Sequence, residues 1–82
     1  MSPEEALRET MHKFRLSGIE IAKRSGVSAT QISSYQSGSR KISAHNLIKI
    51  ANALSPEAQE YYLFLVFGIE KLKSKEMSGS AS

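Results

Sequence analysis

The strongest constraint on this chain is a serine that stands, five times, just before a stretch with helical spacing of apolar residues. A helix leaves its first four backbone N–H groups without partners inside the helix, and a serine hydroxyl placed before it accepts a hydrogen bond from one of them. Three of these serines also have Glu or Gln three positions later, the spacing of a capping box. The five serines are Ser2, Ser17, Ser28, Ser43 and Ser55. The sequence therefore predicts five helix starts.

The residues around the serines agree with this reading. Three caps have a hydrophobic staple, in which the residue before the cap meets one five positions on: Leu16 with Ile21, Val27 with Ile32, and Ile42 with Leu47. Gly26 and Gly38 stand where two helices should end in a left-handed turn. No segment shows sustained strand alternation. We expect an all-α fold with helices at about 3–15, 18–25, 29–37, 44–53 and 56–73.

The apolar residues of these segments recur with the 3.6-residue period of a helix and predict its buried face. A chain of 82 residues has room for one small domain. We expect that domain at 1–73, followed by a flexible tail at 74–82 that is rich in serine. The predicted core residues are Leu7, Met11, Phe14, Ile21, Ala22, Ile32, Tyr35, Leu47, Ile50, Ala51 and Leu54.

The composition argues against catalysis and against a metal or cofactor site. The chain has no cysteine and no aspartate, and its two histidines, His12 and His45, are far apart in sequence. Metal binding and acid–base chemistry draw mainly on those residue types. The longest apolar run is the seven residues 61–67, whereas a membrane-spanning helix needs roughly 18 to 20. The amino terminus lacks the pattern of a secretory signal. We expect a cytoplasmic protein that is not an enzyme, with no membrane partner.

Charge is segregated along the chain. The net charge is +3, but residues 13–49 carry seven cations against Glu20, which gives +6, and the flanks together carry −3. A basic centre of this kind suits a polyanionic partner, although a solvated basic surface is the equally common alternative. Charge alone does not decide between them.

Two of the predicted helices, 18–25 and 29–37, are short and joined by a tight turn that contains Gly26. This is the pattern of a helix-turn-helix, whose second helix can enter the major groove of DNA. The alternative is a purely structural helical corner.

The run from Leu16 to Leu54 resembles, without a gap, the helix-turn-helix domain of the lambda-repressor-like or Cro-like (XRE-type) family. The matching positions are Leu16, Ser17, Glu20, Ala22, Gly26, Val27, Ser28, Ile32, Ser33, Gly38, Arg40, Ser43, Leu47, Ile50, Ala51 and Leu54. The resemblance implies a five-helix DNA-binding domain with its helix-turn-helix at about 17–37, usually a dimer on a palindromic operator. Gly18, Ser25 and Gln36 depart from the usual residues of the family.

The resemblance also implies which residues face DNA. Base reading falls to the start and outer face of the third helix, at Ser28, Ala29, Thr30, Gln31, Ser33 and Ser34. Phosphate contacts fall to Ser17, Ser37, Arg40 and Lys41. Thr30 and Gln31 have helix-start chemistry as their alternative role, and Lys23 and Arg24 are equally compatible with phosphate contact or solvation.

The last predicted helix, at 56–73, has apolar residues on every side, so the domain core can cover only part of it. We expect a homodimer through this helix, with an interface formed by Tyr61, Tyr62, Phe64, Leu65 and Phe67. The predicted function is a double-stranded DNA-binding transcriptional regulator, a repressor that works as a homodimer, with no small-molecule ligand. The alternative is a protein-interaction module, such as an antitoxin-like adaptor, whose last helix binds an unlike partner.

Overall fold

A computed structural model describes residues 1–68 of the chain, and all regular secondary structure in that range is helical. The helices are α1 (Pro3–Lys13), α2 (Gly18–Ser25), α3 (Ala29–Ser37), α4 (Ala44–Ala53) and α5 (Pro56–Phe67). The predicted all-α, five-helix fold is therefore confirmed. The tail predicted at 74–82 lies outside the described residues.

Every predicted serine caps its helix. In each case the hydroxyl oxygen accepts a hydrogen bond from the backbone N–H three residues on, over 3.1 to 3.3 Å. The predicted stops are also present, because Gly26 and Gly38 adopt left-handed conformations with φ of +80° and +81°. Local hydrogen bonding at the helix ends thus sets where α2 and α3 begin and stop.

Helix α1 ends two residues earlier than the predicted 3–15. Its last helical residue is Lys13, and Arg15 turns the chain with φ of +52°. The backbone N–H of Leu16 then donates to the Met11 carbonyl at 2.9 Å. Arg15 therefore makes the kind of turn that glycine usually makes at a helix end. The apolar period could not reveal this end, because Phe14 packs on the core from its position at the cap.

Helix α5 does not continue through the predicted 56–73. It ends at Phe67, and Gly68 leaves the helix with φ of +86° while its N–H donates to the Phe64 carbonyl. The rest of the predicted helix, 69–73, lies outside the described residues.

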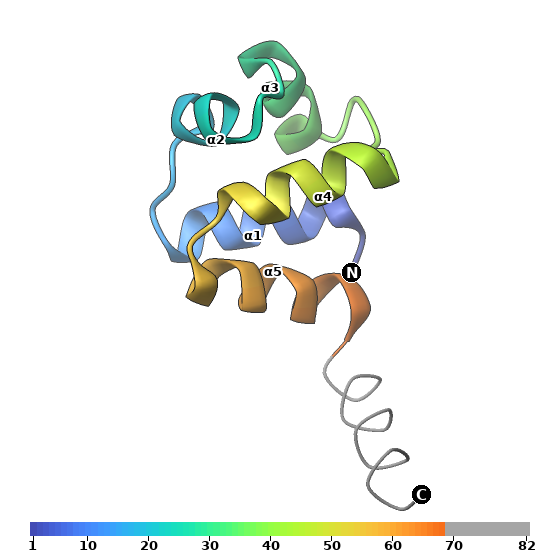
Figure 1. The fold of residues 1–82 in the computed structure, drawn as a ribbon. Coiled ribbons are helices and arrows are strands. Elements are labelled where there is room, and N and C mark those ends of the chain that lie inside the picture. Colours follow the sequence, from blue (N-terminus) through green and yellow to red (C-terminus); the bar gives the residue numbers. More distant parts are fainter. Residues whose placement is uncertain (69–82) are drawn as a thin grey trace, which may run out of the picture.

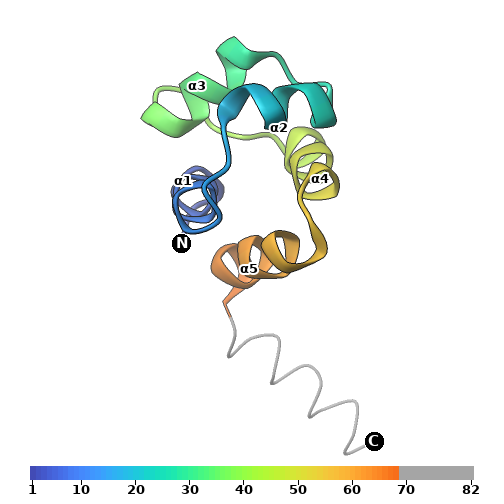
Figure 2. The same cartoon turned by 90° about the vertical axis from the view of Figure 1, so that its left-hand side faces the viewer.

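The five helices form three levels (Figures 1 and 2). Helices α1 and α4 form the middle level and stand on opposite sides of the domain in Figure 2, α2 and α3 cover one end, and α5 covers the other. Helix α1 contacts both α3 and α5, while α4 contacts both α2 and α5. The helix-turn-helix and the last helix therefore occupy opposite ends of the domain.

The core contains the predicted residues and five further buried apolar residues: Ala6, Val27, Ile42, Ala58 and Tyr62. Eight of the predicted residues are buried, and Phe14, Ala22 and Leu47 are half-buried against them. Ala58 and Tyr62 of α5 join this core. The eight buried residues are Leu7, Met11, Ile21, Ile32, Tyr35, Ile50, Ala51 and Leu54.

The assignment of Tyr62 to the dimer interface is wrong. Its side chain has 0% exposure, and its hydroxyl donates to the Pro3 carbonyl oxygen at 3.2 Å. Tyr62 thereby fastens α5 to the first turn of α1. The apolar pattern of α5 could not single it out, because that pattern is nearly the same on every side.

We expect Tyr62 to make the domain sensitive to alkaline pH. Burial, and then the Glu4 carboxylate, raise the pKa of Tyr62 well above its usual range. The unfolded chain therefore loses this proton from about pH 10 upward while the folded chain keeps it, and stability falls by up to about 1.4 kcal/mol per pH unit. Tyr62→Phe should flatten this decline, at a cost of about 1 kcal/mol near pH 7 because its hydrogen bond is removed.

Urea unfolding between pH 7 and 11 measures this effect, with the half-buried Tyr61→Phe as the matched control. Equal alkaline slopes for the parent and Tyr62→Phe would contradict it.

Candidate nucleic-acid interface

The turn between α2 and α3 is held by its own backbone and by one buried side chain. The Gly26 N–H donates to the Ala22 carbonyl at 3.0 Å, and the Ser25 hydroxyl oxygen accepts from the Val27 N–H at 3.1 Å. Val27 is 4% exposed and belongs to the same core as Ile32, its predicted staple partner. Together these contacts fix the angle at which α3 leaves α2.

Gly18 allows the start of α2 to approach α3 closely. A Cβ atom at this position would lie 3.3 Å from Gln36 Oε1 and 3.4 Å from Ile32 Cγ2. Both distances are at or below ordinary van der Waals separation, so a larger residue would have to displace Gln36. Two departures from the family pattern, Gly18 and Gln36, therefore fit one another across the helix-turn-helix.

The inner face of α3 is anchored on α4 as well as on α2. Ile32 and Tyr35 are almost completely buried, and the Tyr35 hydroxyl accepts a hydrogen bond from Asn46 Nδ2 at 2.8 Å. A buried tyrosine hydroxyl usually has a hydrogen-bond partner, and here that partner fixes the Tyr35 side of α3 against α4. The same outer face of α3 is therefore kept toward solvent.

That outer face carries most of the predicted base-reading residues. Ser28, Ala29, Thr30 and Ser33 are exposed, whereas Gln31 and Ser34 are half-buried. The Ser28 hydroxyl also caps α3 by accepting from the Gln31 N–H at 3.1 Å. The exposed surface thus consists of hydroxyl and methyl groups, with Gln31 as its longest side chain.

Several hydrogen bonds of the turn after α3 share one acceptor, the carbonyl oxygen of Ser34. This oxygen accepts from the backbone N–H groups of Ser39 at 3.0 Å and Arg40 at 3.3 Å. The hydroxyls of Ser37 and Ser39 also donate to it, at 3.1 and 3.3 Å. Ser37, predicted to contact phosphate, therefore also serves to build the turn. Ser39 was not singled out from the sequence, and the signal for it is the Ser-Gly-Ser run at the end of α3.

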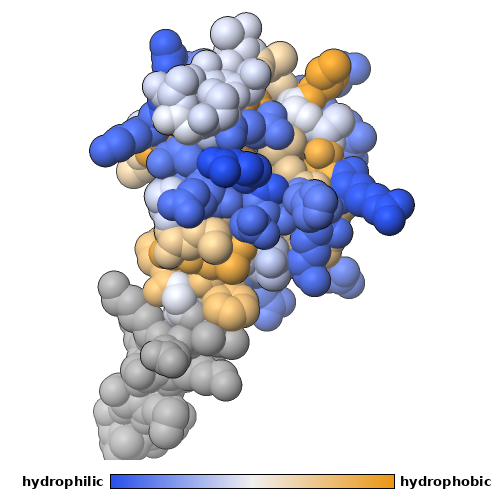
Figure 3. Space-filling model, turned by 180° about the vertical axis from the view of Figure 1, so that it is seen from behind, coloured by the Kyte–Doolittle hydropathy of each residue, from blue (hydrophilic) through white to orange (hydrophobic). Residues whose placement is uncertain are grey.

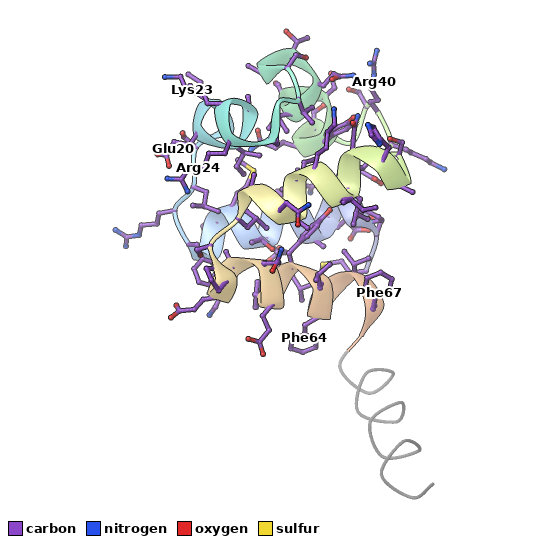
Figure 4. The ribbon with its side chains drawn as sticks, viewed as in Figure 1. Glu20, Lys23, Arg24, Arg40, Phe64 and Phe67 are labelled. Atoms are coloured by element: carbon purple, nitrogen blue, oxygen red, sulfur yellow. The ribbon has the colours of Figure 1, made fainter. Side chains whose placement is uncertain are left out.

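The cations predicted to face phosphate are exposed. Arg40 and Lys41 follow the turn after α3, and Ser17 is exposed at the start of α2. In Figure 4, Lys23 and Arg40 project at the same end of the molecule, on either side of α3. Arg24 lies on the other side of α2, near Glu20. The view from behind (Figure 3) shows hydrophilic surface over most of the domain and an apolar area at the α5 end.

A family model described as helix-turn-helix matches residues 5–55. The chain belongs to this helix-turn-helix family. The match, of the XRE or lambda-repressor-like type, runs from the first turn of α1 to Ser55, the cap of α5. Members of this family are DNA-binding regulators, so DNA binding is the function that the helix-turn-helix domain carries. No curated protein and no solved structure matches the chain.

The described part of the helix-turn-helix protein has neither a metal-binding cluster nor a membrane-spanning helix. Within residues 1–68, no group of three or more His or Glu side chains is placed to hold a metal ion. No helix in this range is long and apolar enough to cross a membrane.

We expect the bond between Tyr35 and Asn46 to be measurable as an energetic coupling. Tyr35→Phe and Asn46→Ala should each reduce the free energy of unfolding by about 1 kcal/mol. The double variant should lose less than the sum, by about 0.5 to 1 kcal/mol, because one hydrogen bond accounts for both losses.

Urea unfolding of the two single variants and the double variant measures the coupling. Asn52→Ala, an exposed asparagine on the same helix, is the control. Strictly additive losses would show that α4 does not hold α3 through this bond.

Proposed function

We propose that the helix-turn-helix domain is a sequence-specific transcriptional regulator of double-stranded DNA that represses by occupying its operator. The observation that carries this proposal is the exposed outer face of α3 beside the Arg40–Lys41 segment, at the end of the molecule that also presents Lys23. The basic centre of the chain, with its net charge of +6, includes these cations. Repression by occupancy needs no function beyond tight, selective binding.

In this proposal α3 enters the major groove and reads bases with few side chains. Gln31 is suited to bidentate hydrogen bonds with adenine, and Ala29 to apolar contact with a thymine methyl group. Thr30 can serve several bases. Because the remaining side chains on this face are small, direct readout is limited, and we expect sequence-dependent DNA shape to contribute.

Phosphate contacts would hold the domain in register along the duplex. Arg40 and Lys41 lie just beyond the carboxyl end of α3, and Ser17 lies at the start of α2. These positions flank the reading helix from two sides. Contacts from two sides of a groove fix position and orientation without reading sequence.

Binding selection on random-sequence duplexes tests the proposed function. We expect one enriched motif and an affinity that falls as salt rises. Gln31→Ala should lose about 1 to 3 kcal/mol of discrimination at one base pair. Arg40→Ala should weaken binding about equally on all sequences and reduce the salt slope by about 0.9.

Arg8→Ala, an exposed cation on α1, is the matched control for charge. Absence of an enriched motif, together with an affinity independent of salt, would refute the DNA-binding proposal.

We further propose a homodimer on a palindromic operator, supported by the apolar residues that α5 leaves uncovered. Phe67 is 50% exposed and Phe64 is half-buried. The other predicted interface residues are engaged within the domain: Leu65 packs on the core, and the Tyr61 ring lies edge-on to Phe14 with ring centroids 5.8 Å apart. Phe64 and Phe67 are therefore the two predicted interface residues that remain available for a contact between copies.

The positions of these two rings have different consequences for DNA binding. In Figure 4, Phe64 lies below α5, at the end of the molecule opposite α2 and α3, whereas Phe67 lies at the side where α5 ends. In a symmetric dimer the two-fold axis passes through the interface between the copies. If the copies met only through their Phe64 surfaces, the two α3 helices would therefore lie at opposite ends of the dimer and face in opposite directions. Reading both halves of one operator favours a contact centred on Phe67.

Molecular mass in solution tests the dimer. We expect about 18 kDa, twice the 9.0 kDa chain, and a monomer for Phe67→Glu at the same concentration, because a buried unpaired charge opposes association. Phe64→Glu is the comparison.

If only Phe64→Glu dissociates the dimer, the two reading faces point apart and the selected motif should be a single half-site. A parent chain that is monomeric would contradict the homodimer and favour the adaptor with an unlike partner.

A further inference from the structure

The first turn of α1 contacts the segment proposed to bind phosphate. Glu4 Oε2 accepts a hydrogen bond from the backbone N–H of Ile42 at 2.8 Å, across 38 positions of sequence. Ile42 is 9% exposed and belongs to the core. This bond ties α1 directly to the loop that connects α3 with α4.

The loop is thereby held on both sides of its two cations. On one side the Arg40 N–H donates to the Ser34 carbonyl at 3.3 Å, and on the other the Ile42 N–H donates to Glu4. Arg40 and Lys41 lie between these two bonds and are exposed. The backbone that carries both cations is therefore fixed while their side chains remain free to reach outward.

The first turn of α1 is itself held in place. The Tyr62 hydroxyl donates to the Pro3 carbonyl at 3.2 Å, and the Ser2 hydroxyl caps the helix. Glu4 therefore acts from a supported position, and a charged acceptor makes a stronger hydrogen bond than a neutral one.

We propose that Glu4 is a positioning residue for the phosphate contacts of Arg40 and Lys41, an inference that rests on the proposed DNA-binding function. By holding the Ile42 N–H, Glu4 orders the loop before DNA arrives, so less conformational freedom is lost on binding. This positioning role favours DNA binding, whereas the negative charge of Glu4 by itself disfavours it. A carboxylate near the binding face repels phosphate, so removal of Glu4 should strengthen binding if charge alone mattered.

The test compares Glu4→Ala with Glu9→Ala, which removes the same charge from an exposed position on the same helix. Both variants change the net charge from +3 to +4. Glu9→Ala should bind the selected duplex as tightly as the parent or more tightly. Glu4→Ala should bind more weakly at 0.1 M salt, by up to about eightfold for each phosphate that the loop no longer neutralises, and each such phosphate should reduce the salt slope by about 0.9.

Two additional variants separate positioning from general destabilisation. Glu4→Gln keeps an oxygen that can accept from the Ile42 N–H, and it should retain the salt slope of Glu9→Gln. In an Arg40→Ala/Lys41→Ala background, Glu4→Ala should cause no further weakening, because the phosphate contacts through which it acts are already absent. Unfolding curves identify the temperature at which each variant is fully folded, and binding is measured there.

The outcomes distinguish this inference from the proposed function. If Glu4→Ala binds as tightly as Glu9→Ala, or if its effect adds fully to that of the double variant, Glu4 is not a positioning residue even though the chain binds DNA. If the Arg40→Ala/Lys41→Ala variant binds like the parent with an unchanged salt slope, the phosphate role of the loop is wrong and the inference falls with it.

Discussion

The fold depends on hydrogen bonds that close the ends of short helices. The five helices contain 8 to 12 residues each, and isolated helices of that length are marginal in water. Their unpaired terminal N–H groups would be costly if left without partners near the core. Five serine caps and the left-handed turns at Arg15, Gly26 and Gly38 solve this problem locally. These caps and turns also set the direction of each helix relative to the preceding one. Those directions bring the apolar faces of the helices together in a small core.

The first turn of α1 joins parts of the domain that are distant in sequence. Tyr62 of α5 donates to Pro3, and Ile42 of the α3–α4 loop donates to Glu4. The end that is proposed to dimerise and the loop that is proposed to bind phosphate thus meet the same helical turn.

The position of α3 is fixed by its buried contacts, whereas its exposed side carries few large side chains. Its buried side is fixed by Ile32, Tyr35 and the bond to Asn46, while its exposed side carries mainly small residues. The close approach of Gly18 to Gln36 also helps to fix α3 against α2. In the proposed complex, small exposed residues would allow the backbone of α3 to come near the base edges, and the rigid support of α3 would then set its position in the groove. Membership of the helix-turn-helix family supports DNA binding by the domain, and the use of this surface of α3 is part of the proposed function. The family match ends where α5 begins.

The sequence alone determined the five helix starts, the two glycine turns and most core residues, because caps, staples and the 3.6-residue period act within a few positions of the chain. It also indicated the face of α3 that is exposed. The left-handed turn at Arg15 escaped prediction because a non-glycine residue carries no local signal for it. The burial of Tyr62 and the contact of Glu4 with Ile42 join positions 59 and 38 residues apart. Only the packing of α1 against α5 and the path of the α3–α4 loop bring those groups together, so the tertiary structure decided them.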